Sequence, residues 1–210
     1  MSPRFIRIGA VAAFVAALLL AVQFVIALGI GNDFALMSKT LDPARMTQFF
    51  QTHANALTAL MASDDAFALA YLIAFITLAL FLMPRAKWLA MLALVFALAT
   101  ALTDWAENSL TLAAVQTAAQ KQTLDANILL VLFWLGQMKY LLIYPAALLF
   151  AFGIWEDGRA GKIFAVSLVL FPIIGIVGIA SELFELLKVL WMLALLLAGG
   201  IFMWRVQTRT

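Results

Sequence analysis

The sequence predicts an all-α protein, a polytopic membrane bundle of six transmembrane helices with one amphipathic interfacial helix. Two observations carry this prediction. Of the 210 residues, 66% are hydrophobic and 11% are charged, whereas a soluble domain is about half apolar and about a quarter charged. Runs of about 20 apolar residues, the length that crosses a bilayer, recur along the chain. They leave no room for a separate soluble domain, so residues 1–210 form a single membrane domain.

The spans are predicted from these apolar runs and from the polar or basic residues between them. The first run follows Arg4 and Arg7 and is longer than the core of a signal peptide, so it is taken as a retained helix. Pro84 to Lys87 form a tight basic turn, which predicts antiparallel neighbours on either side. Ser181 is the expected cap at the turn between the last two spans. The predicted spans are 8–30, 66–83, 88–115, 128–152, 163–180 and 182–204.

The connection between the first two spans carries the interfacial helix, predicted over residues 42–62. Asp42-Pro43 is a typical helix start, with Asp as N-cap and Pro in the first helical position. Met46, Phe49 and Phe50 then recur at helical spacing, with polar residues opposite. Such an amphipathic helix lies at the membrane surface or caps the bundle.

Basic residues predict the orientation, because cytoplasmic loops are enriched in Lys and Arg. We expect an inner (cytoplasmic) membrane location with both termini in the cytoplasm. The inner side then carries Arg4, Arg7, Arg85, Lys87, Arg159, Lys162, Arg205 and Arg209, and the outer side Lys39, Arg45, Lys121 and Lys188.

A polar stripe near the end of the third span is the first candidate site. Asp104, Glu107, Asn108 and Thr111 follow at i, i+3, i+4 and i+7, so they share one face of a helix. An ionisable group at membrane depth costs a few kcal/mol on insertion scales. The stripe should therefore face a partner helix, a cavity or a ligand.

Lys139 lies near the middle of the fourth span, the next helix along the chain. Its long side chain can reach toward the stripe, and we expect an intramembrane ion pair with Asp104 or Glu107. Such a pair can equally serve only to fix the packing of two helices. The expected hydrogen-bonding neighbours are Gln137, Tyr140 and Tyr144.

Other polar residues allow further interpretations. Glu182, Glu185 and Asp64 could form an outer acidic mouth that concentrates protons, metal ions or cationic ligands, or they could simply be favourable residues in the first turns of helices. His53 is the only histidine and lies on an apolar helix face, so no metal site is predicted. Gln23 in the first span is expected to make a packing hydrogen bond.

Composition removes several function classes. The chain has no cysteine, which excludes disulfides, thiolate catalysis and Cys-ligated metals. A net charge of +2 does not indicate a nucleic-acid partner. The motifs of zincins, serine hydrolases and nucleotide-binding loops do not occur. We expect no cofactor, and as partners the lipid bilayer, another membrane protein or a second copy.

The combination of Asp104-x-x-Glu107-Asn108 with a mid-span Lys139 in the following helix resembles patterns in uncharacterised bacterial multi-pass membrane proteins. The resemblance implies no activity. Three function classes remain: a non-enzymatic membrane protein with a structural, accessory or assembly role; a small proton- or cation-coupled transporter, or a membrane protein that binds a lipid or small molecule; and a membrane enzyme acting on a lipid. The first is favoured.

Overall fold

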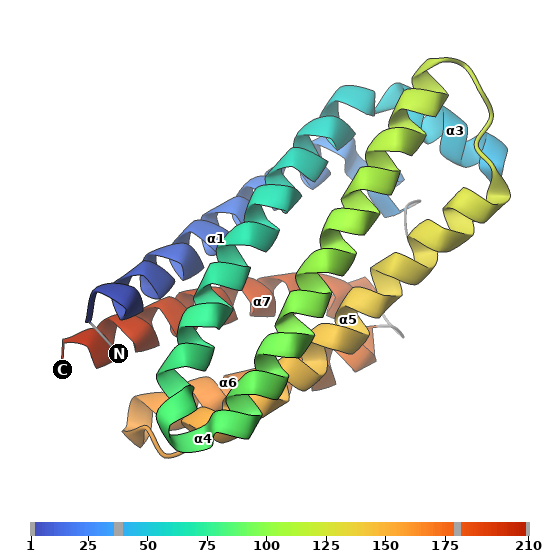
Figure 1. Cartoon of the computed structure of the whole chain (residues 1–210). Coiled ribbons are helices and arrows are strands. Elements are labelled where there is room, and N and C mark those ends of the chain that lie inside the picture. The colour runs from blue at the N-terminus through green and yellow to red at the C-terminus, as the bar shows by residue number, and fades with distance from the viewer. Residues whose placement is uncertain (1–2, 36–39, 179–181, 209–210) are drawn as a thin grey trace.

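The computed structural model describes residues 3–35, 40–178 and 182–208 (Figure 1). These residues are almost entirely helical and contain no strand. The elements in order are α1 (Pro3–Ile30), the 3-10 helix η1 (Gly31–Ala35), α3 (Pro43–Thr52), α4 (Ala54–Ala119), α5 (Ala126–Ile154), α6 (Gly158–Gly178) and α7 (Glu182–Gln207).

Five helices of the described chain, α1 and α4 to α7, are long and apolar enough to cross a membrane. Their outer faces carry many large exposed apolar side chains, such as Trp134, Leu141 and Leu102. A water-soluble monomer rarely exposes apolar surface on this scale. The fold is therefore consistent with an integral membrane protein of several spans.

Helix α4 is a hairpin of two antiparallel arms, residues 54–85 and 87–119, that meet at Ala86 (Figure 1). Ala86 has non-helical angles of φ −136° and ψ 50°, and nearby Pro84 lacks the N–H that a regular helix needs. Tyr71 and Asp104, 33 residues apart, are joined by a hydrogen bond of 2.6 Å, although a straight helix would separate them by about 50 Å. The antiparallel pair predicted from the basic turn is thus present.

The predicted helix over 42–62 is divided into two in the structure. Asp42 is the N-cap of α3, as predicted, and accepts a hydrogen bond from Ala44 N at 3.0 Å. The helix breaks at His53, which has φ −111° and ψ 20°, and residues 54–62 belong to α4. The break lets α3 lie across the end of the bundle, where Phe50 is fully buried, while α4 turns to follow the bundle axis.

Helix α3 is also tied to the connection between α4 and α5. Gln51 Nε2 donates a hydrogen bond of 2.8 Å to the carbonyl of Ala118, and Leu124 N donates one of 3.0 Å to Thr47 Oγ1. Asp125 is the N-cap of α5, and its side chain accepts a hydrogen bond of 2.7 Å from Asn127 N. The end of the bundle that α3 covers is called the α3 end below.

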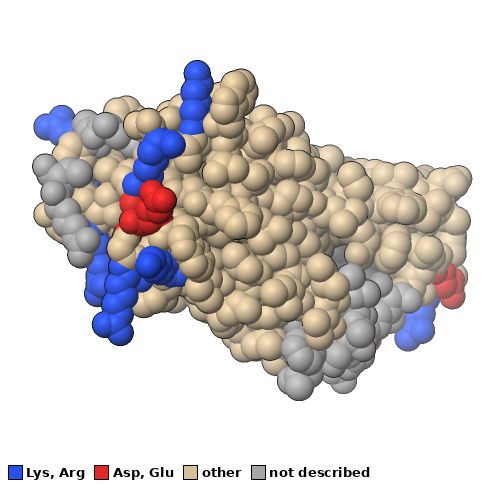
Figure 2. All heavy atoms as spheres, turned by 90° about the horizontal axis from the view of Figure 1, so that it is seen from below, with Lys and Arg blue, Asp and Glu red and all other residues tan. Residues whose placement is uncertain are grey.

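The opposite end, called the termini end, holds both termini, the α4 turn and the α5–α6 connection (Figure 1). Arg85 of the turn pairs with Asp157 through two contacts, and the guanidinium of Arg7 lies 5.4 Å from the ring centre of Trp204. Lys and Arg side chains gather at this end around a small acidic patch, while the surface between the ends carries no charge in the view of Figure 2. The turn predicted at Ser181 lies outside the described residues.

A candidate binding cavity with a charged network

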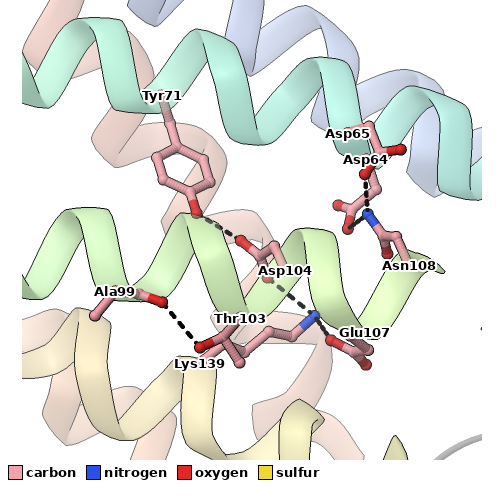
Figure 3. Close-up of polar contacts among 9 residues, drawn as sticks. All are labelled: Asp64, Asp65, Tyr71, Ala99, Thr103, Asp104, Glu107, Asn108 and Lys139. Atoms are coloured by element: carbon pink, nitrogen blue, oxygen red, sulfur yellow. Dashed lines mark hydrogen bonds and ion pairs between the residues drawn. The ribbon is translucent and has the colours of Figure 1, made fainter. Parts of the chain in front are cut away.

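Lys139 of α5 lies between two acidic side chains of the second arm of α4. Its Nζ is 2.6 Å from Glu107 Oε2 and 3.4 Å from Asp104 Oδ1 (Figure 3). The three side chains are largely removed from solvent, with 22% of Lys139, 19% of Glu107 and 8% of Asp104 exposed. The structure thus brings together the cation and the two acids that the sequence analysis singled out.

Tyr71 completes this network from the first arm. Its hydroxyl donates a hydrogen bond of 2.6 Å to Asp104 Oδ2, so each oxygen of Asp104 has its own partner. The sequence analysis expected Tyr140 or Tyr144 in this position and missed Tyr71. The hairpin itself indicates this pairing. Tyr71 and Asp104 lie 15 and 18 residues from Ala86 on opposite arms, so they are at a similar depth along the bundle.

Asn108 forms a second link between the arms. It is 1% exposed, and its Nδ2 donates hydrogen bonds of 2.9 Å to Asp64 Oδ2 and to Asp65 Oδ1 (Figure 3). The two amide hydrogens therefore serve two different carboxylates. Trp105 Nε1 adds a 3.4 Å hydrogen bond to the carbonyl of Asp65.

The polar stripe lies on one buried face of the second arm, as its spacing predicts. Thr100, Asp104, Asn108 and Thr111 are all buried. The hydroxyl of Thr100 bonds within its own helix, to the carbonyl of Phe96. The stripe faces both the neighbouring arm and a cavity inside the bundle.

This cavity has a volume of about 350 Å³ and is lined by residues of α1, both arms of α4, α5, α6 and α7. On the first arm alone its wall extends from Leu60 to Leu78, which is about 27 Å at the rise of an α-helix. The wall residues of that arm repeat on one helix face: Leu60, Met61, Asp64, Phe67, Tyr71, Ala74, Phe75 and Leu78. The cavity is therefore long and narrow.

The two halves of the cavity differ in chemistry. The half toward the α3 end contains Asp64, Asp104, Glu107 and Lys139. The half toward the termini end is apolar, with a wall formed by Ala13, Ala74, Leu78, Phe164, Leu168 and Met203. A long apolar chamber with a polar group at one end is suited to an amphiphilic molecule.

Gln23 of α1 contributes a polar group without a partner. It lines the cavity, and its Nε2 is buried and makes no hydrogen bond within the described part of the chain. The packing hydrogen bond expected for Gln23 is therefore not formed by this nitrogen. Buried polar groups are nearly always bonded, so this amide is available to a molecule in the cavity.

The remaining candidate residues lie around the network. Tyr140 lines the cavity, and its ring faces the Nζ of Lys188 at 3.9 Å. Tyr144 packs against Gly175 of α6. Gln137 is exposed and forms no hydrogen bond with the network within the described part of the chain.

The proposed acidic mouth stays a prediction. Asp64 lies in the network, whereas the side chains of Glu182 and Glu185 are outside the described residues. His53 lies at the α3 end, 3.5 Å from Asp33 Oδ2. Among the described residues, no three His, Asp or Glu side chains are grouped so as to hold a metal ion.

The chain was compared with protein-family models, with curated proteins and with solved structures. None of these comparisons gave a match. The resemblance based on Asp104-x-x-Glu107-Asn108 and Lys139 therefore stays a prediction.

Proposed function

We propose that the protein is a six-span protein of the cytoplasmic membrane, with both termini in the cytoplasm and α3 at the outer surface. Each arm of α4 has more residues than the 20 or so that a span needs, which supports two crossings by this element. The concentration of Lys and Arg at the termini end supports the orientation (Figure 2).

We further propose that the protein binds a lipid-like molecule in its cavity without transforming it chemically. The observation that supports this proposal is the cavity. Its 350 Å³ lies within the range of small-molecule sites, about 300–1,000 Å³, which are mostly apolar with a few convergent polar groups. Its length of about 27 Å is close to the thickness of the bilayer core, so an extended hydrocarbon chain fits along it.

The polarity of the wall orients the ligand. A hydrocarbon tail would occupy the half toward the termini end, where Ala74 and Met203 are among the wall residues and burial of apolar surface drives binding. A polar head would lie near Gln23 and Asp64, where hydrogen-bonding groups are available. This binding role extends the non-enzymatic function that the sequence favours.

The test is to close the tail half and measure the ligand that remains. Ala74 lines the cavity and is buried, so Ala74→Phe places a ring in the empty space. Ala66→Phe, on an exposed position of the same arm, is the matched control. Both proteins are purified in a mild detergent, and the released amphiphiles are quantified by mass spectrometry after denaturation.

The wild type and Ala66→Phe should retain the same amphiphile in near-stoichiometric amount, while Ala74→Phe should retain several-fold less at an unchanged size-exclusion profile. Equal retention by all three proteins would show that the cavity does not hold the ligand. A wild type that carries no amphiphile above a detergent blank would overturn the proposal directly.

A further inference from the structure

We propose that the ligand carries a positively charged head, such as a protonated or quaternary amine, and that Asp64 receives it. This inference rests on the proposed binding of an amphiphile and adds the chemical class of its head. It follows from the balance of charges on the wall, from the partners of each charge and from the rings around Asp64.

The charges on the cavity wall do not balance. Among the described residues, three acidic side chains line the cavity, Asp64, Asp104 and Glu107, against one basic side chain, Lys139. With every group ionised, the wall carries two negative charges more than positive ones. A cation entering the cavity would reduce this excess, whereas an anion would add to it.

The single lysine is already shared by the other two acids. Its Nζ lies 2.6 Å from Glu107 and 3.4 Å from Asp104. Lys188, the other lysine nearby, lies over the ring of Tyr140. Neither of them pairs with Asp64, and no basic side chain in the described part of the chain does so.

Asp64 therefore holds a charge with only an amide for a partner. The same Nδ2 of Asn108 also serves Asp65, the next residue, at 2.9 Å. Both carboxylates are only partly exposed, and a charge that leaves water without a compensating charge is costly. The bond to Asn108 fixes the direction of Asp64 without neutralising it.

The surroundings of Asp64 suit an organic cation. Phe67 and Tyr71 of the same arm line the cavity and pack edge to face, with ring centres 5.2 Å apart. Aromatic rings attract alkylammonium groups through their negative faces. The unpartnered Nε2 of Gln23 on the same cavity wall is an independent indication of a ligand in the cavity. A monovalent amine also needs fewer oxygen ligands than a divalent metal ion.

The experiment uses the full-length protein in nanodiscs and three amphiphiles that share one tritiated alkyl tail. Their heads are a trimethylammonium, a neutral maltoside and a sulfate. Equilibrium binding is measured with empty nanodiscs subtracted, for the wild type, Asp64→Asn, Asp64→Glu and Asp42→Asn. Asp42 is exposed at the start of α3, and Asn also caps helices well, so this variant controls for the loss of one negative charge.

The cationic amphiphile should bind the wild type about tenfold more tightly than the other two, which is the scale that the attraction of a quaternary ammonium to a carboxylate and to neighbouring aromatic rings allows. Asp64→Asn should lose this preference and keep its affinity for the maltoside, which also shows that it is folded. Asp64→Glu and Asp42→Asn should keep the preference.

Equal binding of the three heads by the wild type, or an unchanged preference in Asp64→Asn, would overturn the cationic head and leave the lipid-like ligand in place. Binding of none of the three above empty nanodiscs would overturn the ligand proposal itself. The two failures are therefore distinguishable.

Discussion

Replacing Lys139 with Met should strongly destabilise the protein, because the change leaves Asp104 and Glu107 without a shared cation. Breaking a buried ion pair by removing one partner costs about 3–5 kcal/mol. Lys139 and Glu107 keep 22% and 19% of their side-chain surface exposed, so we expect a value at the low end, about 3 kcal/mol.

The assay is reversible unfolding in mixed micelles, with SDS as denaturant and far-ultraviolet circular dichroism as the signal. The set comprises the wild type, Lys139→Met, Glu107→Gln and the double variant. Because the double variant removes both charges of the shorter contact, it should recover at least half of the loss seen in Lys139→Met. The coupling energy from this cycle measures the Lys139–Glu107 interaction.

Two results would refute this reasoning. If Lys139→Met stayed within about 0.5 kcal/mol of the wild type, the range of ordinary surface substitutions, the charges would be facing water rather than one another. If the losses of the two single variants simply added in the double variant, Lys139 and Glu107 would not be coupled. Either result would also remove the premise that Lys139 is occupied by its two acids.

Two further substitutions test the contacts between helices with the same SDS titration. Tyr71→Phe should lower the free energy of unfolding by about 2 kcal/mol, since it deletes a hydrogen bond to a charged group, and a loss near zero would mean that Asp104 does not depend on it. Gly175→Ala should cost about 1–3 kcal/mol, because a Cβ there would overlap the hydroxyl of Tyr144. Gly29→Ala, with nothing within 4 Å of the added carbon, should stay close to the wild type, and equal losses at both glycines would contradict the close packing.

The sequence was sufficient for the parts of the fold that depend on local chemistry. The Asp42-Pro43 start and the reversal at Pro84 each depend on residues within a few positions of one another. The division at His53 was missed. His53 has no helix-breaking character, and the break follows from how α3 packs across the bundle end.

For the site, the sequence predicted which residues share a helix face but not how the helices are rotated against each other. Helical spacing placed Asp104 and Asn108 on one face. Lys139 lies close enough to the depth of Asp104 in the membrane for the sequence to predict their pairing. The partner from the first arm, Tyr71, depends on packing that a single helix does not encode. Asp64 was interpreted as the start of a span, whereas α4 continues through it, and the cavity follows from six helical segments together.

The hairpin at Ala86 has a consequence for how the protein is made. Residues 54–119 emerge from the ribosome and can pair arm against arm before α5 exists, because domains and their parts form in the order of synthesis. The carboxyls of Asp64, Asp65, Asp104 and Glu107 thus arrive in the membrane ahead of Lys139. Until α5 is inserted, no lysine or arginine of the hairpin lies beside these carboxyls, because Arg85 and Lys87 stand at its turn. Insertion of α5 is then the step at which Lys139 supplies the first cation beside Asp104 and Glu107.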